Sequence, residues 1–463
     1  MALVLRGYQQ DIIGELRQRM RSGQRRILVC SPTGSGKTAL TANMLGTSAS
    51  KGMNSVFIVH RRELVKQSAL AFDKADVFHG IIASGFPTDR RPLVQVASVQ
   101  TLARRFHRMP YPKLIIWDEC HHIAAGSWDK IFKAFPQAFH VGLTATPERL
   151  DGKGLDKWFT EMVKGPSVSW LIENNYLAPY RLYAPSRLSL EGVRTQMGDY
   201  RKSDVIDVVD KPRITGSAIN EYRKVAYGKR AVVFCVSVKH SSHVVNEFNA
   251  AGIPARHVDG ENPTHERDQA IKLFAEGKIK VLSNVDLFGE GFDLPSIEVA
   301  ILLRPTQSLG LYLQQVGRAL RTHPDKEEAI ILDHVGNVER HGLPDEDREW
   351  SLAGRGPKRK GDKNTGIGVK VCDQCFAAQL PGAEKCKFCG FEFIKQPRTV
   401  EEVEGELVEV DPKVLQMKKK SEQARAESME DLIQLAKDRG YKRPEGWAKH
   451  VFNARQAKKI RGL

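Results

Sequence analysis

The sequence of 463 residues has no apolar run long enough to cross a bilayer, which excludes a protein anchored by a membrane-spanning helix. Its first residues, MALVLRGYQQDII, also lack the basic start and long apolar stretch of a secretory signal. We therefore expect a cytoplasmic location and no membrane partner. The length is enough for two or three globular domains.

Acidic residues are fewer than basic ones. The sequence has 55 Asp and Glu and 71 Lys and Arg, which gives a formal net charge of +16. Half of this excess lies in residues 351–463. Such a balance favours a polyanionic partner, and nucleic acid is the commonest one. Charge alone leaves open a protein that is basic without such a partner.

Cysteine is scarce except near the C-terminal end. Three cysteines stand alone within apolar stretches and are expected to be reduced core residues: Cys30, Cys120 and Cys235. The other four have C-x2-C-x10-C-x2-C spacing and are Cys372, Cys375, Cys386 and Cys389. Two such pairs can surround Zn²⁺ with four thiolates, and a unit this small would take its folding energy from the metal. Reduced thiols without metal, or a redox pair, are the alternatives.

Two stretches of the chain alternate short Val-, Ile- and Leu-rich runs with helical segments, which is typical of parallel sheets built from β-α-β units. In the first stretch the runs are RRILVC, SVFIVH, VQVASV, KLIIWD and HVGLTA. In the second they are RAVVFCVS, IPARHVD, IKVLSNVD, VAILLR and AIILDHV. The predicted fold class is therefore α/β, with two units in tandem joined near NNYLAPYRLYAPS.

Shifts in composition predict five segments. Residues 1–175 and 176–345 are the two α/β domains, and 346–369 are a basic, Gly-rich flexible linker. Residues 370–394 form the four-cysteine module, and 395–463 a charged, largely helical basic tail. The end of the tail mixes aromatic and basic residues, which suits either a nucleic-acid-contacting element or a small packed helix pair with a solvated face.

A Gly-rich turn lies directly between a predicted strand and a predicted helix in ILVCSPTGSGKTAL. Backbone N–H groups of such a turn can approach phosphate closely, and the helix N-terminus adds a favourable dipole. We expect Lys37 to reach the β- and γ-phosphates of a nucleotide and Thr38 to hold Mg²⁺. Ser31 stands where the strict phosphate-loop pattern has Gly, and a chance Gly-rich turn is the alternative. The rest of the predicted phosphate cradle is Thr33, Gly34, Ser35 and Gly36.

Residues 117–123, WDECHHI, bring an Asp, a Glu, a Cys and two His together and raise the question of a metal site. Consecutive side chains leaving a strand alternate in direction, so these five are not expected to converge on one ion. Asp118 follows the apolar run KLIIW, and an Asp at the carboxyl end of a parallel strand can hold Mg²⁺. Glu119 could then activate water as a general base. Solvated loop acids are the alternative, but together with the phosphate loop the pair predicts an NTPase.

Several stretches, in order, resemble the motifs of superfamily 2 helicases. SPTGSGKT, DECH, GLTATP and QQVGRALR resemble motifs I, II, III and VI. LRGYQ resembles the adenine-reading motif, VFIVHRRELVKQ motif Ia, VASVQTL motif Ib, VVFCVSVKH motif IV and VLSNVDLFGEGFDLP motif V. The match covers residues 3–335 and points to DEAD/DEAH-box-type DNA helicases of the XPB/UvsW-like or phage-encoded kind. It implies two RecA-like P-loop domains with ATP and Mg²⁺ in the cleft between them.

The resemblance also implies roles for residues at matching positions. Arg6 and Gln9 would read adenine, and Gly291 and Asp293 would sense the nucleotide. Coupling of hydrolysis to movement would fall to three residues, His121, Thr144 and Thr146. The second domain would face the γ-phosphate with residues that recur at helical spacing, so that one helix face carries two guanidinium groups: Gln314, Arg318 and Arg321.

Contacts with nucleic acid are implied for loop residues that follow predicted strands. Phosphate contacts of this kind give salt-dependent binding that is largely independent of base sequence. Solvated loop residues are the alternative. The residues concerned are Arg61, Arg62, Ser98, Gln100, Thr101 and Asn284, the last standing where many relatives have Thr.

The prediction is therefore an ATP-dependent DNA helicase or translocase, acting in replication, recombination or repair, with 3′-to-5′ movement favoured by the resemblance. Single-stranded or branched DNA is the expected partner, and the cysteine module is a candidate contact for replication or recombination proteins. The alternatives are an RNA helicase and the motor subunit of a restriction or defence complex. A vestigial ATPase that only binds nucleic acid is disfavoured by the intact motif residues.

Overall fold

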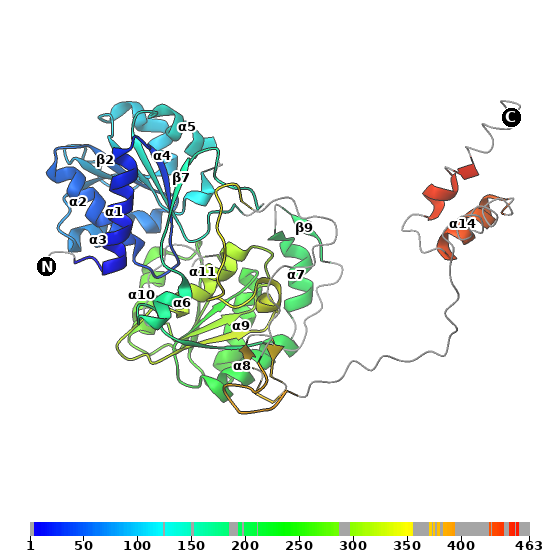
Figure 1. Ribbon diagram of the computed structural model, residues 1–463. Coiled ribbons are helices and arrows are strands. Elements are labelled where there is room, and N and C mark those ends of the chain that lie inside the picture. The colour runs from blue at the N-terminus through cyan, green and yellow to red at the C-terminus, as the bar shows by residue number, and fades with distance from the viewer. Residues whose placement is uncertain are drawn as a thin grey trace, which may run out of the picture. The chain divides into compact units, whose positions relative to one another are not determined.

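The computed structural model describes residues 4–123, 126–149, 152–184, 193–196, 199–210, 212–286, 297–354, 370–372, 374–375, 377–379, 383–393, 426, 428–438, 444–449 and 451–452. The chain divides into two compact units, Met1–Phe393 and Ile394–Leu463. The first unit contains two parallel sheets flanked by helices, drawn blue to cyan and green to yellow in Figure 1. The predicted α/β class with two tandem RecA-like lobes is confirmed.

The first lobe is built on a seven-stranded parallel sheet of order β3-β4-β2-β5-β6-β1-β7. Five strands match the predicted apolar runs: β1 (Arg26–Cys30), β2 (Ser55–Val59), β4 (Val94–Ser98), β5 (Leu114–Trp117) and β6 (Phe139–Thr144). The two edge strands, β3 (His79–Ile82) and β7 (Glu161–Lys164), are not predicted from the sequence. They are only partly buried, so they lack the continuous apolar run that marks the inner strands.

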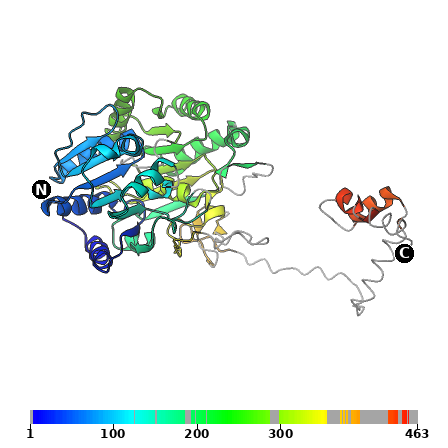
Figure 2. The same ribbon diagram turned by 90° about the horizontal axis from the view of Figure 1, so that it is seen from above.

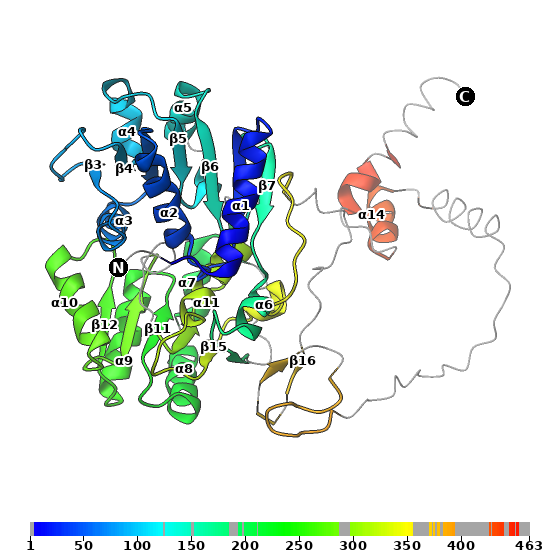
Figure 3. The same cartoon turned by 60° about the vertical axis from the view of Figure 1, so that its left-hand side comes forward.

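Helices cover both faces of this sheet (Figure 3). Side chains alternate along β1, so Ile27 packs in one cluster with Leu40 and Leu28 in another with Trp128. The first face carries α1 (Gly7–Arg21), α2 (Lys37–Ser50) and α3 (Arg62–Lys74), and the second carries α4 (Val99–Arg105) and α5 (Gly126–Ala134). Short turns η1 (Phe106–Arg108) and η2 (Cys120–His122) and helix α6 (Val168–Glu173) complete the lobe.

The second lobe is a six-stranded parallel sheet of order β12-β13-β11-β14-β15-β8. The predicted runs become β11 (Ala231–Phe234), β12 (Ala255–Val258), β13 (Val281–Asn284), β14 (Val299–Leu302) and β15 (Ala329–Asp333). The stretch predicted to join the lobes supplies the edge strand β8 (Tyr180–Tyr183), which pairs in parallel with β15. Flanking helices are α8 (Pro212–Val225), α9 (Val238–Ala250), α10 (Thr264–Ala275), α11 (Leu309–Ala319) and α12 (Asn337–His341).

The sequence predicts no helix or strand for the segment between β8 and α8. It forms a small antiparallel pair, β9 (Thr195–Gln196) with β10 (Asp199–Tyr200), followed by α7 (Lys202–Val209). The Asp199 carboxylate accepts hydrogen bonds from the Thr306 hydroxyl at 2.9 Å and the Gln307 amide at 2.7 Å. These bonds fix the segment to the loop after β14.

The composition predicts a flexible linker from residue 346, but within it Leu352 and Gly354 contact the first lobe and Arg348 the second. The Leu352 carbonyl accepts hydrogen bonds from the backbone amides of Leu155 at 2.7 Å and Asp156 at 3.1 Å. This stretch precedes the Lys/Arg-rich run that suggested a linker, and composition does not report such backbone pairing. The rest of the predicted linker, 355–369, lies outside the described residues.

The cysteine module lies against the second lobe (Figures 2 and 3). Its strands β16 (Lys370–Val371) and β17 (Ala378–Gln379) pair in antiparallel fashion. Ala377, just before β17, forms a bridge with Tyr183 of the edge strand β8. The module therefore continues the hydrogen bonding of the second sheet at its exposed edge.

The second unit is described in part. Helix α14 (Met429–Asp438) and the helical residues 444–449 and 451–452 share a small apolar cluster centred on Leu432, Ala448 and Val451. Trp447 and Phe452, aromatic residues of the tail for which the sequence left open a nucleic-acid contact or a packed helix pair, pack against this cluster. Across the described parts of both units, no helix has the length and apolarity that a bilayer crossing requires.

Candidate active site

The phosphate loop lies between β1 and α2, as predicted from the sequence. Gly34 and Gly36 adopt φ angles of 86° and 78°, in the left-handed region that glycine occupies without strain. Ser31 is buried, and its hydroxyl donates a hydrogen bond to the Ser35 hydroxyl at 2.7 Å. The serine at the position of the usual glycine therefore closes the base of the loop.

Lys37 begins α2 and folds back over the loop. Its ammonium donates to the backbone carbonyls of Ser31 at 3.1 Å and Pro32 at 3.2 Å. Burial lowers the pKa of Lys37, while the nearby Glu119 and Asp118 oppose this shift. A half-buried cation that donates to two carbonyls and faces two acids is well suited to bind the phosphates of a nucleotide.

The two acids of the DECH box follow β5. The Asp118 amide donates to the Ile58 carbonyl at 3.0 Å, and Glu119 adopts a left-handed conformation with φ of 44°. Burial and then the charge of Glu119 raise the pKa of Asp118 to about 6. Such a pair of crowded carboxylates favours a bound cation, and Thr38 lines the same cavity of about 670 Å³. These residues fit a Mg²⁺ site with Thr38 and Asp118 as its protein ligands.

The second lobe closes this nucleotide cavity from the opposite side. Arg318 and Arg321 on and just after α11 line it together with Lys37 and Glu119. Arg318 is 3% exposed. Gln314 lies one turn earlier and lines the neighbouring cavity instead, so the structure does not bring it to the phosphate loop. Its proposed contact with the γ-phosphate remains a prediction.

Arg6 and Tyr176 lie together on one wall of the nucleotide cavity. The Arg6 guanidinium lies 4.8 Å from the centroid of the Tyr176 ring, and both residues line the nucleotide cavity. The Gln9 amide turns onto the loop and donates to the Ser35 carbonyl at 3.1 Å. Tyr176 could not be predicted from the sequence, because no local pattern links a tyrosine before β8 to a motif 170 residues earlier.

A row of imidazoles leads away from Glu119. His121 Nδ1 lies 3.5 Å from Glu119 Oε2 and 3.2 Å from the Thr144 hydroxyl, which donates to the Thr146 carbonyl at 2.7 Å. The three predicted coupling residues are thus in contact, and their role in coupling remains a prediction. His122, for which the sequence indicated no role, packs against His121 with ring centroids 4.3 Å apart and the rings tilted by 42°.

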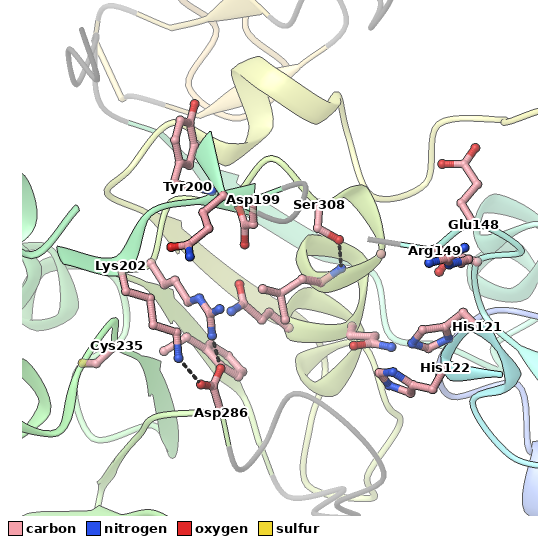
Figure 4. A pocket seen from close by; sticks show the side chains of 18 of the residues that line it. His121, His122, Glu148, Arg149, Asp199, Tyr200, Lys202, Cys235, Asp286 and Ser308 are labelled. Carbon is pink, nitrogen blue, oxygen red and sulfur yellow. Dashed lines mark hydrogen bonds and ion pairs between the residues drawn. The ribbon is translucent and has the colours of Figure 1, made fainter. Parts of the chain in front are cut away.

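A second cavity of about 1060 Å³ lies on the other side of these histidines (Figure 4). Of the residues predicted to contact nucleic acid, Arg61 and Asn284 line it. Asn284 is buried and donates to the Val233 carbonyl at 2.8 Å.

The remaining predicted nucleic-acid contacts make local interactions. The Ser98 hydroxyl donates to that of Thr101 at 2.9 Å, and Gln100 donates to the His60 carbonyl at 3.1 Å. The Arg62 guanidinium lies 5.5 Å from the centroid of the Phe86 ring. Their contact with nucleic acid remains a prediction. The predicted nucleotide sensors Gly291 and Asp293 lie outside the described residues.

The four cysteines of the C-terminal module converge. All four sulfurs lie within 4.8 Å of one another, with Cys372 and Cys389 3.6 Å apart and Cys375 and Cys386 3.5 Å apart. Tetrahedral Zn²⁺ with bonds of about 2.3 Å requires sulfur separations of about 3.8 Å, so the cluster fits zinc. Burial opposes ionisation of Cys386, but the backbone N–H groups of Cys389 and Phe388, together with hydrogen bonds from the Cys375 and Cys389 thiols, lower its pKa to about 7.

Comparison with known proteins identifies the family. Residues 2–149 match the family "Type III restriction enzyme, res subunit", and residues 213–323 match "Helicase conserved C-terminal domain". A "51.5 kDa protein" of Lactococcus phage (isolate 7-9) is 36% identical over 85% of this chain and 84% of its own length. The chain belongs to the superfamily 2 helicases. It is an ATP-hydrolysing enzyme of that superfamily.

Two further similarities are to proteins with longer chains. The "Putative ATP-dependent helicase IRC3" of Saccharomyces cerevisiae is 30% identical over 72% of this chain, which spans 52% of the yeast protein. The solved fragment of a "putative HsdR subunit of a type I restriction enzyme" from Vibrio vulnificus YJ016 has a TM-score of 0.59 and 23% identity. It covers 73% of this helicase and 65% of its own chain, and it shows a shared fold.

Proposed function

We propose that this helicase couples ATP hydrolysis to movement along DNA. The observation that carries the proposal is the composition of the nucleotide cavity, to which both lobes contribute charged groups. Lys37 and Glu119 come from the first lobe and Arg318 and Arg321 from the second. Because both lobes contribute groups to the site, loss of the γ-phosphate changes the contacts between the lobes. This provides a physical link between hydrolysis and lobe movement.

The proposed chemistry assigns one task to each group. Lys37 binds the β- and γ-phosphates, Asp118 and Thr38 hold Mg²⁺, and Glu119 orients and deprotonates the attacking water. Arg318 and Arg321 stabilise the charge that develops on the transferred phosphoryl group. Bound Mg²⁺ would neutralise phosphate charge, and it would also lower the pKa of Asp118 from its raised value in the free protein.

The base of the nucleotide is proposed to lie against Arg6 and Tyr176, which both line the nucleotide cavity. The guanidinium and the phenol ring already stack on one another at 4.8 Å. Both flat groups can stack on a purine, which supports a preference for ATP or GTP over pyrimidine nucleotides. Gln9 would act on the loop rather than on the base, because its amide is engaged by the Ser35 carbonyl.

DNA is the proposed polymer, and 3′-to-5′ is the proposed direction. The formal charge of +16 and the basic side chains of the second cavity support an anionic strand. The direction rests on the resemblance to XPB/UvsW-like helicases alone. Replication, recombination and repair are proposed settings on the same ground.

Stimulation of ATPase activity by single-stranded DNA and by RNA of equal length, at equal salt, tests this function. We expect DNA to stimulate more strongly, and Lys37→Ala to abolish the stimulated turnover. Lys51→Ala, at the exposed C-terminal end of the same helix, is the matched control and should retain it. Greater stimulation by RNA would favour the RNA helicase alternative.

A second candidate is the motor subunit of a restriction or defence complex. It is favoured by the family match of residues 2–149 and by the fold shared with an HsdR fragment. The two candidates differ in what the purified chain does to duplex DNA. A helicase separates strands of a 3′-tailed duplex, whereas a restriction motor displaces a bound triplex-forming strand and leaves the duplex paired.

The four-cysteine module is proposed to bind structural zinc. Its sulfurs form a closed set of four, so no coordination position remains for catalysis. A replication or recombination protein is the proposed partner of this module, and DNA is the alternative partner. Pull-down with the intact helicase and with a zinc-free cysteine variant would distinguish a partner that needs the folded module.

A further inference from the structure

Asp286, two residues after β13, is surrounded by cations from three separate segments. Its carboxylate pairs with Lys202 at 2.7 Å and with Arg304 (Figure 4). Its backbone carbonyl accepts a hydrogen bond from the Arg61 guanidinium at 2.6 Å. Arg61 follows β2 of the first lobe, Lys202 begins α7, and Arg304 follows β14, so one residue ties two lobes and the β9–β10–α7 segment together.

The position of Asp286 is unusual for its residue type. Its φ of 56° lies in the left-handed region, which costs a non-glycine residue some backbone energy. Burial opposes ionisation, yet Arg304 and Lys202 together hold the pKa of the Asp286 carboxyl below its ordinary value. The cations therefore face a full negative charge at the wall of the 1060 Å³ cavity.

We propose that the Asp286 carboxylate occupies the place of a backbone phosphate, and that an entering single strand displaces it from Lys202 and Arg304. The proposal rests on the proposed function, because it requires a nucleic-acid strand in this cavity. Carboxylate and phosphodiester are both anions that accept hydrogen bonds from guanidinium and ammonium groups. Exchange is open to solvent, since the side chains of Asp286 and Lys202 are 41% and 56% exposed.

The arrangement makes Asp286 a competitor of the strand. In the free protein it neutralises the two cations and, through Arg61, holds the first lobe against the loop after β13. A strand must break the ion pairs of Asp286 with Lys202 and Arg304 before it can pair with these two cations itself. Part of the binding free energy of the strand is therefore spent on breaking these pairs. Strand binding would be linked in this way to release of the contact between the lobes.

The test compares binding of fluorescent dT20 and rU20 to the full chain, its Asp286→Asn variant and its Asp268→Asn variant. Asn tolerates a positive φ and retains the backbone carbonyl, so Asp286→Asn removes charge with little change of shape. We expect Asp286→Asn to tighten binding about fivefold, because two partly exposed ion pairs no longer compete.

Asp268→Asn is the matched control, because Asp268 pairs with Lys66 across the same two lobes at 3.2 Å but outside the cavity. It should bind as the natural protein does. Lys202→Ala in the natural background should weaken binding about fivefold, because it removes a proposed phosphate contact. Unchanged or weaker binding by Asp286→Asn, with an unaltered melting temperature, would overturn the proposal.

The two polymers separate this inference from the proposed function. If the natural protein binds neither dT20 nor rU20, the proposed function fails and takes the inference with it. If the natural protein binds one of them and Asp286→Asn binds no more tightly, only the inference is wrong. If all variants bind rU20 more tightly than dT20, the proposed displacement of Asp286 still holds, but RNA rather than DNA is the polymer.

Discussion

Gly317 of α11 lies so close to Thr33 of the phosphate loop that an added Cβ would be 2.7 Å from the Thr33 Cβ. Real Cβ atoms do not approach neighbours to this distance, so only glycine allows the two lobes to meet here. The contact brings Arg318, the next residue, into the nucleotide cavity. The second lobe thus meets the phosphate loop where the Gly317 backbone lies against the Thr33 side chain.

Gly317→Ala should therefore separate the lobes at the cavity while leaving each lobe folded. We expect ATPase turnover to fall at least tenfold, since small displacements of catalytic groups have large effects on rate. Gly14→Ala in α1, where an added Cβ meets nothing within 4 Å, is the matched control. It should retain turnover and raise stability by up to about 1 kcal/mol. Full ATPase turnover in Gly317→Ala would contradict the claim that the close contact between Gly317 and Thr33 positions the second lobe.

Lys326 stabilises the end of the helix that carries the arginines. Its buried ammonium donates to the carbonyls of Ile297 at 3.0 Å and Arg321 at 2.5 Å, and also to that of Ala319. Lys326→Met keeps the apolar stem and removes these three hydrogen bonds. We expect a loss of about 2 kcal/mol in the free energy of unfolding. Chemical denaturation measures it, with the exposed Lys278→Met as control.

His140 makes the stability of the first lobe depend on pH. Its Nδ1 accepts from the Trp117 indole at 3.1 Å and its Nε2–H donates to the Phe135 carbonyl at 2.8 Å, so the neutral ring is required. Burial lowers the pKa of His140 to about 4. Because the folded state disfavours protonation, its contribution is full above about pH 6.5 and is lost as the pH falls through 4, in total about 3 kcal/mol.

Urea denaturation at pH 7 and pH 4.5 would measure this loss. His140→Gln keeps one donor and one acceptor but does not titrate, so its free energy of unfolding should change less between the two pH values. Equal changes in the variant and the natural protein would show that His140 does not titrate in this window.

Metal analysis tests the cysteine module. We expect one zinc per chain in the natural protein and none in Cys386→Ser, because a closed set of four thiolates binds zinc far more tightly than three. Cys235→Ser removes a buried thiol of the second lobe and should keep its zinc. Zinc in Cys386→Ser at the natural stoichiometry would contradict the assignment.

Local patterns predicted the inner strands, the phosphate loop and the cysteine cluster, because each depends on residues within one short stretch. The contacts that assemble the site were harder to predict. Tyr176 reaches Arg6, and Asp286 meets Arg61, only after two sheets have formed and packed. Gln314 shares a helix face with Arg318 by spacing, yet it lines the other cavity, because the path of α11 between the lobes is set by packing.

Turnover of Arg318→Ala and Arg321→Ala tests the central claim most directly, since both residues belong to the second lobe and line a cavity formed on the phosphate loop of the first. Stimulated ATP hydrolysis and binding of a fluorescent ATP analogue should be measured on the same samples. The account predicts at least about a 100-fold loss of turnover with analogue binding retained, because these arginines act on the charge of the transition state. Natural turnover in both variants would contradict a site completed by the second lobe.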